Sequence, residues 1–215
     1  MILYTVPISN FGAKVQIALA VKKLEADQKL PPDGYASESY KQIIPTGTVP
    51  AIIDGDVVLS ESETILEYLE ERYPLPALMP KDIAARANVR MLSRFHDLKL
   101  EPSLRVLFKH MAPSIRDAGI VSEKHAEFIK HTEMLTRLGS FKPYIAGSEI
   151  TFADCGFAPT FLLATKMFHV LEQSCAFPEP IQIWCEALKK NVAVSRVLET
   201  YTEAVENWVK LKLTQ

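Results

Sequence analysis

Short β-branched runs alternate with helical patterns over about the first 75 residues. A β-branched and aliphatic run covers Ile2 to Val6, and from Gly12 to about Leu24 apolar residues recur at helical spacing. We expect Lys14, Lys22 and Lys23 to mark the solvent-facing side of that helix. The alternation of strand and helix patterns predicts an α/β unit.

A hairpin is predicted between residues 51 and 59. Ala51-Ile52-Ile53 and Val57-Val58-Leu59 flank Asp54-Gly55, a dipeptide typical of tight hairpin turns. Pro50 can only open the first of these strands, because it has no N–H to donate to a ladder. A weaker strand is predicted around residues 28–30.

The next helix is predicted to begin with a capping box, Ser60-x-x-Glu63. Its apolar stripe is formed by Ile65, Leu66, Leu69 and Tyr73. Three prolines then follow within seven residues, at positions 74, 76 and 80, and no helix continues through them. We therefore predict a domain at 1–74, a linker at 75–81 and a second domain at 82–215.

Helical patterns dominate from Asp82 onward, which predicts an all-α second domain. The first helix runs from Asp82 to Met111 with a kink near Pro102. Thr151-x-x-Asp154 is a second capping box, ahead of an apolar helix. The other helices are predicted at 122–138, 157–168, 181–188 and 194–208.

Charge and composition exclude several function classes. A formal net charge of −2 over 215 residues gives no general attraction to nucleic acid or anionic membranes. No apolar run approaches the ~20 residues of a membrane-spanning helix. Three cysteines without a CxxC motif fit a reducing cytoplasm, and the five histidines have no metal-ligand spacing. We therefore expect a cytoplasmic protein without a metal site.

Ser9 lies between the first strand and the first helix. A hydroxyl there can donate a hydrogen bond to an anion, and the helix N-terminus adds free N–H groups and a partial positive charge. A thiol bound at such a place would have its thiolate favoured. The alternative is an ordinary helix N-cap serine.

The ends of the hairpin could hold a small peptide. If the Val49–Pro50 bond were cis, the backbone of Val49 could pair with a peptide ligand, whereas a trans proline would only open the strand. Glu61 could accept an ammonium group, and Ser62 with the helix N-terminus could bind a carboxylate. The alternative role of Glu61 and Ser62 is helix capping.

Together these segments resemble the glutathione transferase family. The family's hairpin motif, N-P-x-G-x-V-P-x-L followed by E-S, stands here as residues 44–52 and Glu61-Ser62. A Y-[LI]-A-G segment with its helix start stands as residues 144–147 and 151–154. The resemblance spans residues 1 to about 205. It implies a thioredoxin-like α/β N-terminal domain followed by an all-α C-terminal domain.

The resemblance also implies roles for individual residues. Val49, with Pro50 cis, would pair with the cysteinyl backbone of glutathione, and Glu61 with Ser62 would hold its γ-glutamyl end. Ser9 would stabilise the thiolate, as in the serine-type classes (phi, tau, theta and zeta).

Thr48 and Tyr4 bear on how glutathione would be held and on which catalytic residue type is present. Thr48, in the glutathione-binding segment, replaces a common Lys or Gln, so a contact to the glycyl end is in doubt. A tyrosine-type mechanism is rejected, because Tyr4 points to the opposite side of the strand from Thr5.

An apolar co-substrate would lie between the first helix and the long helix after residue 82. Either a pocket lining or ordinary core packing explains each apolar candidate. The candidates are Phe11, Phe95, Lys99, Arg105, Phe108 and Met111.

The predicted function is a glutathione transferase that joins the glutathione thiolate to a small apolar electrophile, acting as a homodimer in the family's manner. Glutathione would be a co-substrate, and no metal, nucleic acid or membrane would take part. Two alternatives remain open. One is a glutathione-dependent isomerase, lyase or dehalogenase on the same fold, and the other is a non-catalytic glutathione-binding module.

Overall fold

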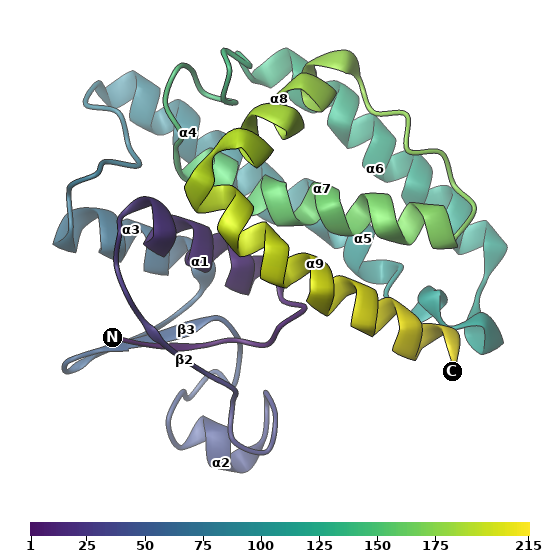
Figure 1. Cartoon of the computed structure of the whole chain (residues 1–215), viewed down its shortest axis with the longest axis horizontal. Coiled ribbons are helices and arrows are strands. Elements are labelled where there is room, and N and C mark those ends of the chain that lie inside the picture. The colour runs from purple at the N-terminus through teal and green to yellow at the C-terminus, as the bar shows by residue number, and fades with distance from the viewer.

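The computed structural model describes residues 1–215 and joins a small mixed sheet to a larger group of helices (Figure 1). The sheet and its helices occupy the N-terminal third of the chain, and no strand follows β4. The elements of this part are β1 (Ile2–Tyr4), α1 (Asn10–Val21), β2 (Asp27–Lys29), α2 (Glu38–Lys41), β3 (Ala51–Asp54), β4 (Val57–Ser60) and α3 (Ser62–Arg72). This is the predicted thioredoxin-like α/β part, and the rest is all-α as predicted.

The sheet has the order β2-β1-β3-β4, with β1 and β2 parallel and the other pairs antiparallel. Alternate residues of β1 face opposite layers. Leu3 packs into the large core shared with α1 and α3, whereas Tyr4 packs with Tyr40 of α2 on the other face. The sheet is therefore covered on both faces, and its apolar positions decide which helix lies on which side.

The C-terminal part is built around α7, most of whose residues are buried. Helix α1 packs against both α7 and α9, so one apolar core runs through the two parts of the chain (Figure 1). The helices are α4 (Ile83–Phe95), α5 (Glu101–Val106), α6 (Ala118–Leu138), α7 (Phe152–Val170), α8 (Glu179–Lys190) and α9 (Val192–Leu213). None of them is long and apolar enough to cross a membrane.

The long helix predicted from Asp82 to Met111 is interrupted earlier than expected. A π-helical turn, His96–Leu100, separates α4 from α5, and Pro102 lies in the first turn of α5. Proline has no backbone N–H, so a regular α-helix would lose one hydrogen-bond donor at Pro102. The wider π-helical turn lies just before that position. The turn carries His96 and Asp97 into the interior, where they take part in the site described below.

Two local predictions were wrong. Lys14 and Lys22 are buried, and only Lys23 of the predicted wet side is exposed, because α1 is covered by neighbours on almost every side. The Ser60–Glu63 capping box is absent: α3 begins at Ser62 with Glu61 as its N-cap residue. The Thr151–Asp154 capping box is present at the start of α7, as predicted.

Candidate functional site

Three candidate segments meet at one end of the sheet because of the strand register. Tyr4, the last residue of β1, lies opposite Ala51, the first residue of β3, and Ala51 lies opposite Ser60, the last residue of β4. The loop up to Ser9, the Val49–Pro50 pair and the Glu61–Ser62 pair extend directly from these three ends. Residues far apart in the sequence are thus brought to the same edge of the N-terminal part.

Ser9 is the N-cap residue of α1 and has only 8% of its surface exposed. Its Oγ accepts a hydrogen bond from the Gly12 N–H at 3.0 Å, which satisfies one orphan donor of the first turn. The N-cap interpretation is confirmed, and the anion-binding interpretation stays a prediction. The capping bond uses a lone pair of the oxygen and leaves the hydroxyl proton free. That proton can be donated to an anion beside the helix N-terminus.

A close contact fixes the loop that carries Ser9. A Cβ atom at Gly12 would lie 2.0 Å from Oγ1 of Thr5. The Thr5 side chain therefore occupies the space that a side chain at position 12 would need. Tyr4 faces the other way and contacts the ring of Tyr40, with 5.4 Å between the ring centroids. The residue on the Ser9 side is Thr5, in agreement with the rejection of a tyrosine-type site.

The Val49–Pro50 peptide bond is cis, as the family resemblance implies. Within the protein, the backbone N–H and C=O of Val49 form no hydrogen bond. Thr48 is exposed, and its carbonyl accepts a hydrogen bond from the Tyr40 hydroxyl at 2.9 Å. The half-buried Val49 therefore presents a free donor and a free acceptor beside Thr48.

Glu61 has a φ of +72° and no side-chain capping hydrogen bond. Its side chain is exposed, whereas Ser62 is buried. The first N–H groups of α3 thus lack a side-chain acceptor from their own N-cap, in contrast to those of α1. A helix start of this kind can bind an anionic group, with the Glu61 carboxylate available to a cation.

Behind these segments lies a buried ionic cluster that sequence reasoning missed. Lys14 of α1 has no exposed surface, and its Nζ lies 2.6 Å from Oε2 of Glu63 and 3.0 Å from Oδ1 of Asp97. Ser93 donates a hydrogen bond of 2.8 Å to the same Glu63 oxygen. Glu63 follows Ser62 directly, so its pairing with Lys14 ties the start of α3 to the helix that begins at Ser9.

Asp97 extends the cluster into the helical part. His96 Nδ1 lies 2.7 Å from an Asp97 oxygen, and His96 Nε2 lies 2.7 Å from Oγ1 of Thr160 in α7. Burial alone would raise the pKa of Asp97, but the hydrogen bond with His96 and the charge of Lys14 lower it to about 2. The signal in the sequence was the apolar character of α1 on all sides, which leaves no solvent-facing position for Lys14.

The second-substrate candidates separate into two groups. The Arg105 guanidinium lies 5.9 Å from the ring centroid of Phe11 and 4.6 Å from that of Phe108, so these three gather in one place. Phe95 packs edge-on against His131, and Met111 has no exposed surface. These two belong to the core, while Lys99 is exposed.

The environment of Cys155 is not that of a reactive thiol. Cys155 is fully buried, and desolvation by burial raises its pKa well above the ordinary thiol value. No group of three or more His, Cys, Asp or Glu side chains is arranged to hold a metal ion.

Comparison with known proteins identifies the family. Residues 3–77 match the family model described as "Glutathione S-transferase, N-terminal domain". The chain is 30% identical over 176 residues to glutathione S-transferase Z2 of Arabidopsis thaliana, covering 78% of each protein. It is also 30% identical to a stringent starvation protein A homolog of Coxiella burnetii, covering 74% of this chain and 73% of that protein.

A solved structure gives the same result at the level of the fold. The holo structure of maleyl pyruvate isomerase, a bacterial glutathione S-transferase of the zeta class, superposes with a TM-score of 0.76. The two chains are 25% identical, and the match covers 92% of this chain and 96% of the other. The matching family model and the 30% identity over 78% of each chain show that this chain belongs to the glutathione transferase family.

Proposed function

We propose that this protein is a serine-type glutathione transferase. Ser9 would donate its hydroxyl hydrogen bond to the sulfur of bound glutathione and hold it as the thiolate, which attacks an electrophilic carbon of a small apolar co-substrate. The observation that carries the proposal is the position of Ser9. Its buried hydroxyl caps α1 with a lone pair and keeps its proton, at the same end of the sheet as Val49–Pro50 and Glu61–Ser62.

The tripeptide would bind through three groups of contacts. The free N–H and C=O of Val49, before Pro50, would pair with the cysteinyl backbone. The uncapped start of α3 with Ser62 would bind the γ-glutamyl carboxylate, and Glu61 its ammonium group. The exposed Thr48 would lie beside the glycyl end. These contacts would bind both a positive and a negative group of the ligand, which favours a zwitterionic peptide.

The co-substrate would lie next to Phe11, Arg105 and Phe108. The two aromatic rings supply apolar surface, and Phe11 is two residues from Ser9. Phe95 and Met111 are left out of this proposal because they are buried. Holding the two reactants together out of water would contribute most of the remaining acceleration.

The test is Ser9→Ala, assayed with glutathione and an activated halo-aromatic or enone. We expect glutathione affinity to change little while turnover falls roughly tenfold or more, because the thiolate of bound glutathione loses one hydrogen-bond donor. The pKa of the bound thiol, measured from thiolate absorbance against pH, should rise in the variant. An unchanged thiol pKa and turnover would remove Ser9 from the mechanism.

The matched control is Asp117→Ala, which removes the N-cap side chain of α6. Asp117 accepts from the Ile120 N–H at 3.0 Å, so its loss costs a helix cap as Ser9→Ala does. We expect similar destabilisation in both variants, and loss of turnover only in Ser9→Ala. Equal losses of turnover would assign the effect to stability.

A second candidate is isomerisation with glutathione as a cofactor, favoured by the solved zeta-class isomerase. With isotopically labelled glutathione, isomerisation would return the labelled tripeptide unconsumed, whereas conjugation would leave the label in the product. A non-catalytic glutathione-binding module is the third candidate, left open by the sequence. It predicts retention on immobilised glutathione without turnover of any co-substrate in a panel. A cytoplasmic homodimer is part of the proposal, and the mass in solution tests the dimer.

A further inference from the structure

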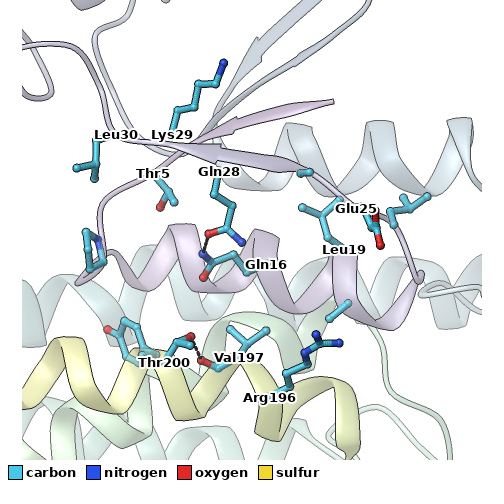
Figure 2. Close-up of a pocket in the computed structure, with 15 residues that line it drawn as sticks. Thr5, Gln16, Leu19, Glu25, Gln28, Lys29, Leu30, Arg196, Val197 and Thr200 are labelled. Atoms are coloured by element: carbon cyan, nitrogen blue, oxygen red, sulfur yellow. Dashed lines mark hydrogen bonds between the residues drawn. The ribbon is translucent and has the colours of Figure 1, made fainter.

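One side-chain contact joins the beginning of α1 to the C-terminal helix. The Tyr201 hydroxyl of α9 donates a hydrogen bond to Oδ1 of Asn10, the first residue of α1. The two helices lie side by side in Figure 2, where Thr200 of α9 lies across from Gln16 of α1. The contact spans 191 residues of the chain and reaches the residue next to Ser9.

The Asn10 side chain has no other hydrogen bond. Asn10 is fully buried, and its Nδ2 is buried without a partner. The bond from Tyr201 is therefore the one polar contact that satisfies this amide. A buried polar group that loses its partner costs more free energy than the hydrogen bond itself contributes. The placement of the Asn10 side chain thus depends on the Tyr201 hydroxyl.

Tyr201 is suited to act as the donor because its hydroxyl keeps its proton. Burial raises the pKa of this hydroxyl far above the ordinary tyrosine value, and the charges of Arg105 and Glu101 act on it in opposite directions. The side chain is only 3% exposed. A neutral phenol in this position donates its proton, and the carbonyl oxygen of the Asn10 amide accepts it.

Asn10 in turn belongs to the turn that fixes Ser9. Ser9 Oγ accepts from the Gly12 N–H at 3.0 Å, and the Ser9 carbonyl accepts from the Ala13 N–H at 2.8 Å. Both bonds lie within the cap and the first turn of α1. The bond between Asn10 and Tyr201 is the hydrogen bond that connects this turn to α9.

We propose that Tyr201 is a positioning residue for the thiolate site, acting through Asn10 on Ser9. Its hydroxyl holds the first turn of α1 in the place where the Ser9 proton can be donated to the sulfur of glutathione. Hydrogen bonds weaken steeply as their geometry departs from the ideal, so a small shift of this turn would reduce the stabilisation of the thiolate. The inference rests on the proposed function of Ser9.

The test is Tyr201→Phe, which removes the hydroxyl and keeps the ring in the core. We expect turnover with glutathione and a halo-aromatic or enone to fall about three- to tenfold, the scale of one hydrogen bond, while KM for glutathione changes little. The pKa of the bound thiol, measured from thiolate absorbance, should rise by about 0.5 to 1, because a tenfold change in an equilibrium corresponds to one pKa unit.

Tyr68→Phe is the matched control. The Tyr68 hydroxyl donates to Oδ2 of Asp54 at 2.9 Å, and Asp54 ends β3 on the side away from Pro50. This variant also loses a tyrosine hydrogen bond, but it should leave the thiol pKa unchanged. The proposal is overturned if Tyr201→Phe changes the thiol pKa no more than Tyr68→Phe does.

A double variant tests the route through Asn10. In an Asn10→Ala background, Tyr201→Phe should cause no further rise in the thiol pKa, because the hydrogen bond that it removes is already absent. Losses that add in the double variant would show that Tyr201 acts by another route, and they too would overturn the proposal.

Hydrogen exchange of the Gly12 amide tests the positioning without glutathione. This amide is held by Ser9 Oγ, so its exchange should be about three- to tenfold faster in Tyr201→Phe. The Ile120 amide, held by the Asp117 cap of α6, should exchange as before. An unchanged rate at Gly12, or an equal increase at Ile120, would overturn the proposal. If the unchanged protein does not lower the thiol pKa of bound glutathione, the proposed function fails, and faster exchange at Gly12 alone still supports the hold of Tyr201 on Ser9.

Discussion

At the scale of single residues, the site depends on how closely the chain approaches itself at Gly12. The space beside this residue is filled by the Thr5 side chain, and the Gly12 N–H supplies the hydrogen bond that Ser9 accepts. No side chain at position 12 is compatible with both the loop and the first turn of α1 as they stand.

We predict that Gly12→Ala destabilises the protein and impairs the site. The added methyl group would meet Thr5 Oγ1 and crowd the Cβ atoms of Thr5 and Ser9, so the Thr5 side chain or its loop must shift, at a cost of about 1–3 kcal/mol for an overpacked buried position. Urea unfolding measures the cost. Gly119→Ala in the first turn of α6, where the nearest atom to a Cβ would be an Asp117 carboxylate oxygen at 3.2 Å, serves as the control. Equal stability of both variants would contradict the prediction.

The residue scale also separates what the sequence could predict from what it could not. The family motifs single out Ser9, Val49, Glu61 and Ser62, and the register of β1, β3 and β4 brings their segments to one end of the sheet. Their roles stay predictions. Lys14 could not be assigned in this way, because a helical lysine is read as exposed until its packing partners are known.

At the scale of elements, the ionic cluster holds three helices and the π-helical turn together. Lys14 contributes from α1, Glu63 from α3 and Asp97 from the turn after α4, and Thr160 of α7 completes the chain of contacts through His96. The early end of α4 was not predicted from Pro102. A proline indicates where a helix is disturbed, but it does not indicate that the preceding turn is π-helical. The turn is what carries Asp97 to Lys14.

We predict that Lys14→Met destabilises the protein by about 3–5 kcal/mol, because two largely enclosed carboxylates, with side chains 14% and 10% exposed, lose their cation. Lys23→Met, at an exposed position just beyond the same helix, is the control and should change stability by less than about 0.5 kcal/mol. Thermal and denaturant unfolding measure both. A loss of equal size in the two variants would show that the buried pairing is not the cause.

At the scale of the whole molecule, the change from strand patterns to helical patterns predicted the architecture, and the prolines predicted where the two parts join. The domain limits at 74 and 82 stay a prediction. What the sequence could not provide was the extent of the contact between the parts. Leu19 of α1 and Leu198 of α9 belong to one apolar core, and Lys22 with Glu70 fastens the linker through an ion pair of 2.6 Å. Side-chain periodicity describes one element at a time and carries no information on such contacts.

The shared interior predicts an acid-labile molecule. The pKa of Asp97 is lowered to about 2 in the folded protein, so its contribution is present above the unfolded value near 4 and is lost as pH falls from about 4 to 2. The contribution is about 2 kcal/mol. Urea midpoints measured across this range should fall more steeply for the unchanged protein than for Asp97→Asn. The exposed Asp56→Asn is the control and should keep the steep slope; parallel slopes for all three would contradict the assignment.

The buried charges also constrain how this chain can change over generations. A single substitution at Lys14, Glu63 or Asp97 leaves a charge in the interior without its counterpart, whereas joint replacement by apolar residues of similar volume costs little. A substitution at any one of the three positions is therefore destabilising while the other two remain charged. Across related sequences we expect the three to covary as a set, with intermediate combinations rare, and a deep alignment would reveal this as coupled columns from three separate stretches of the chain.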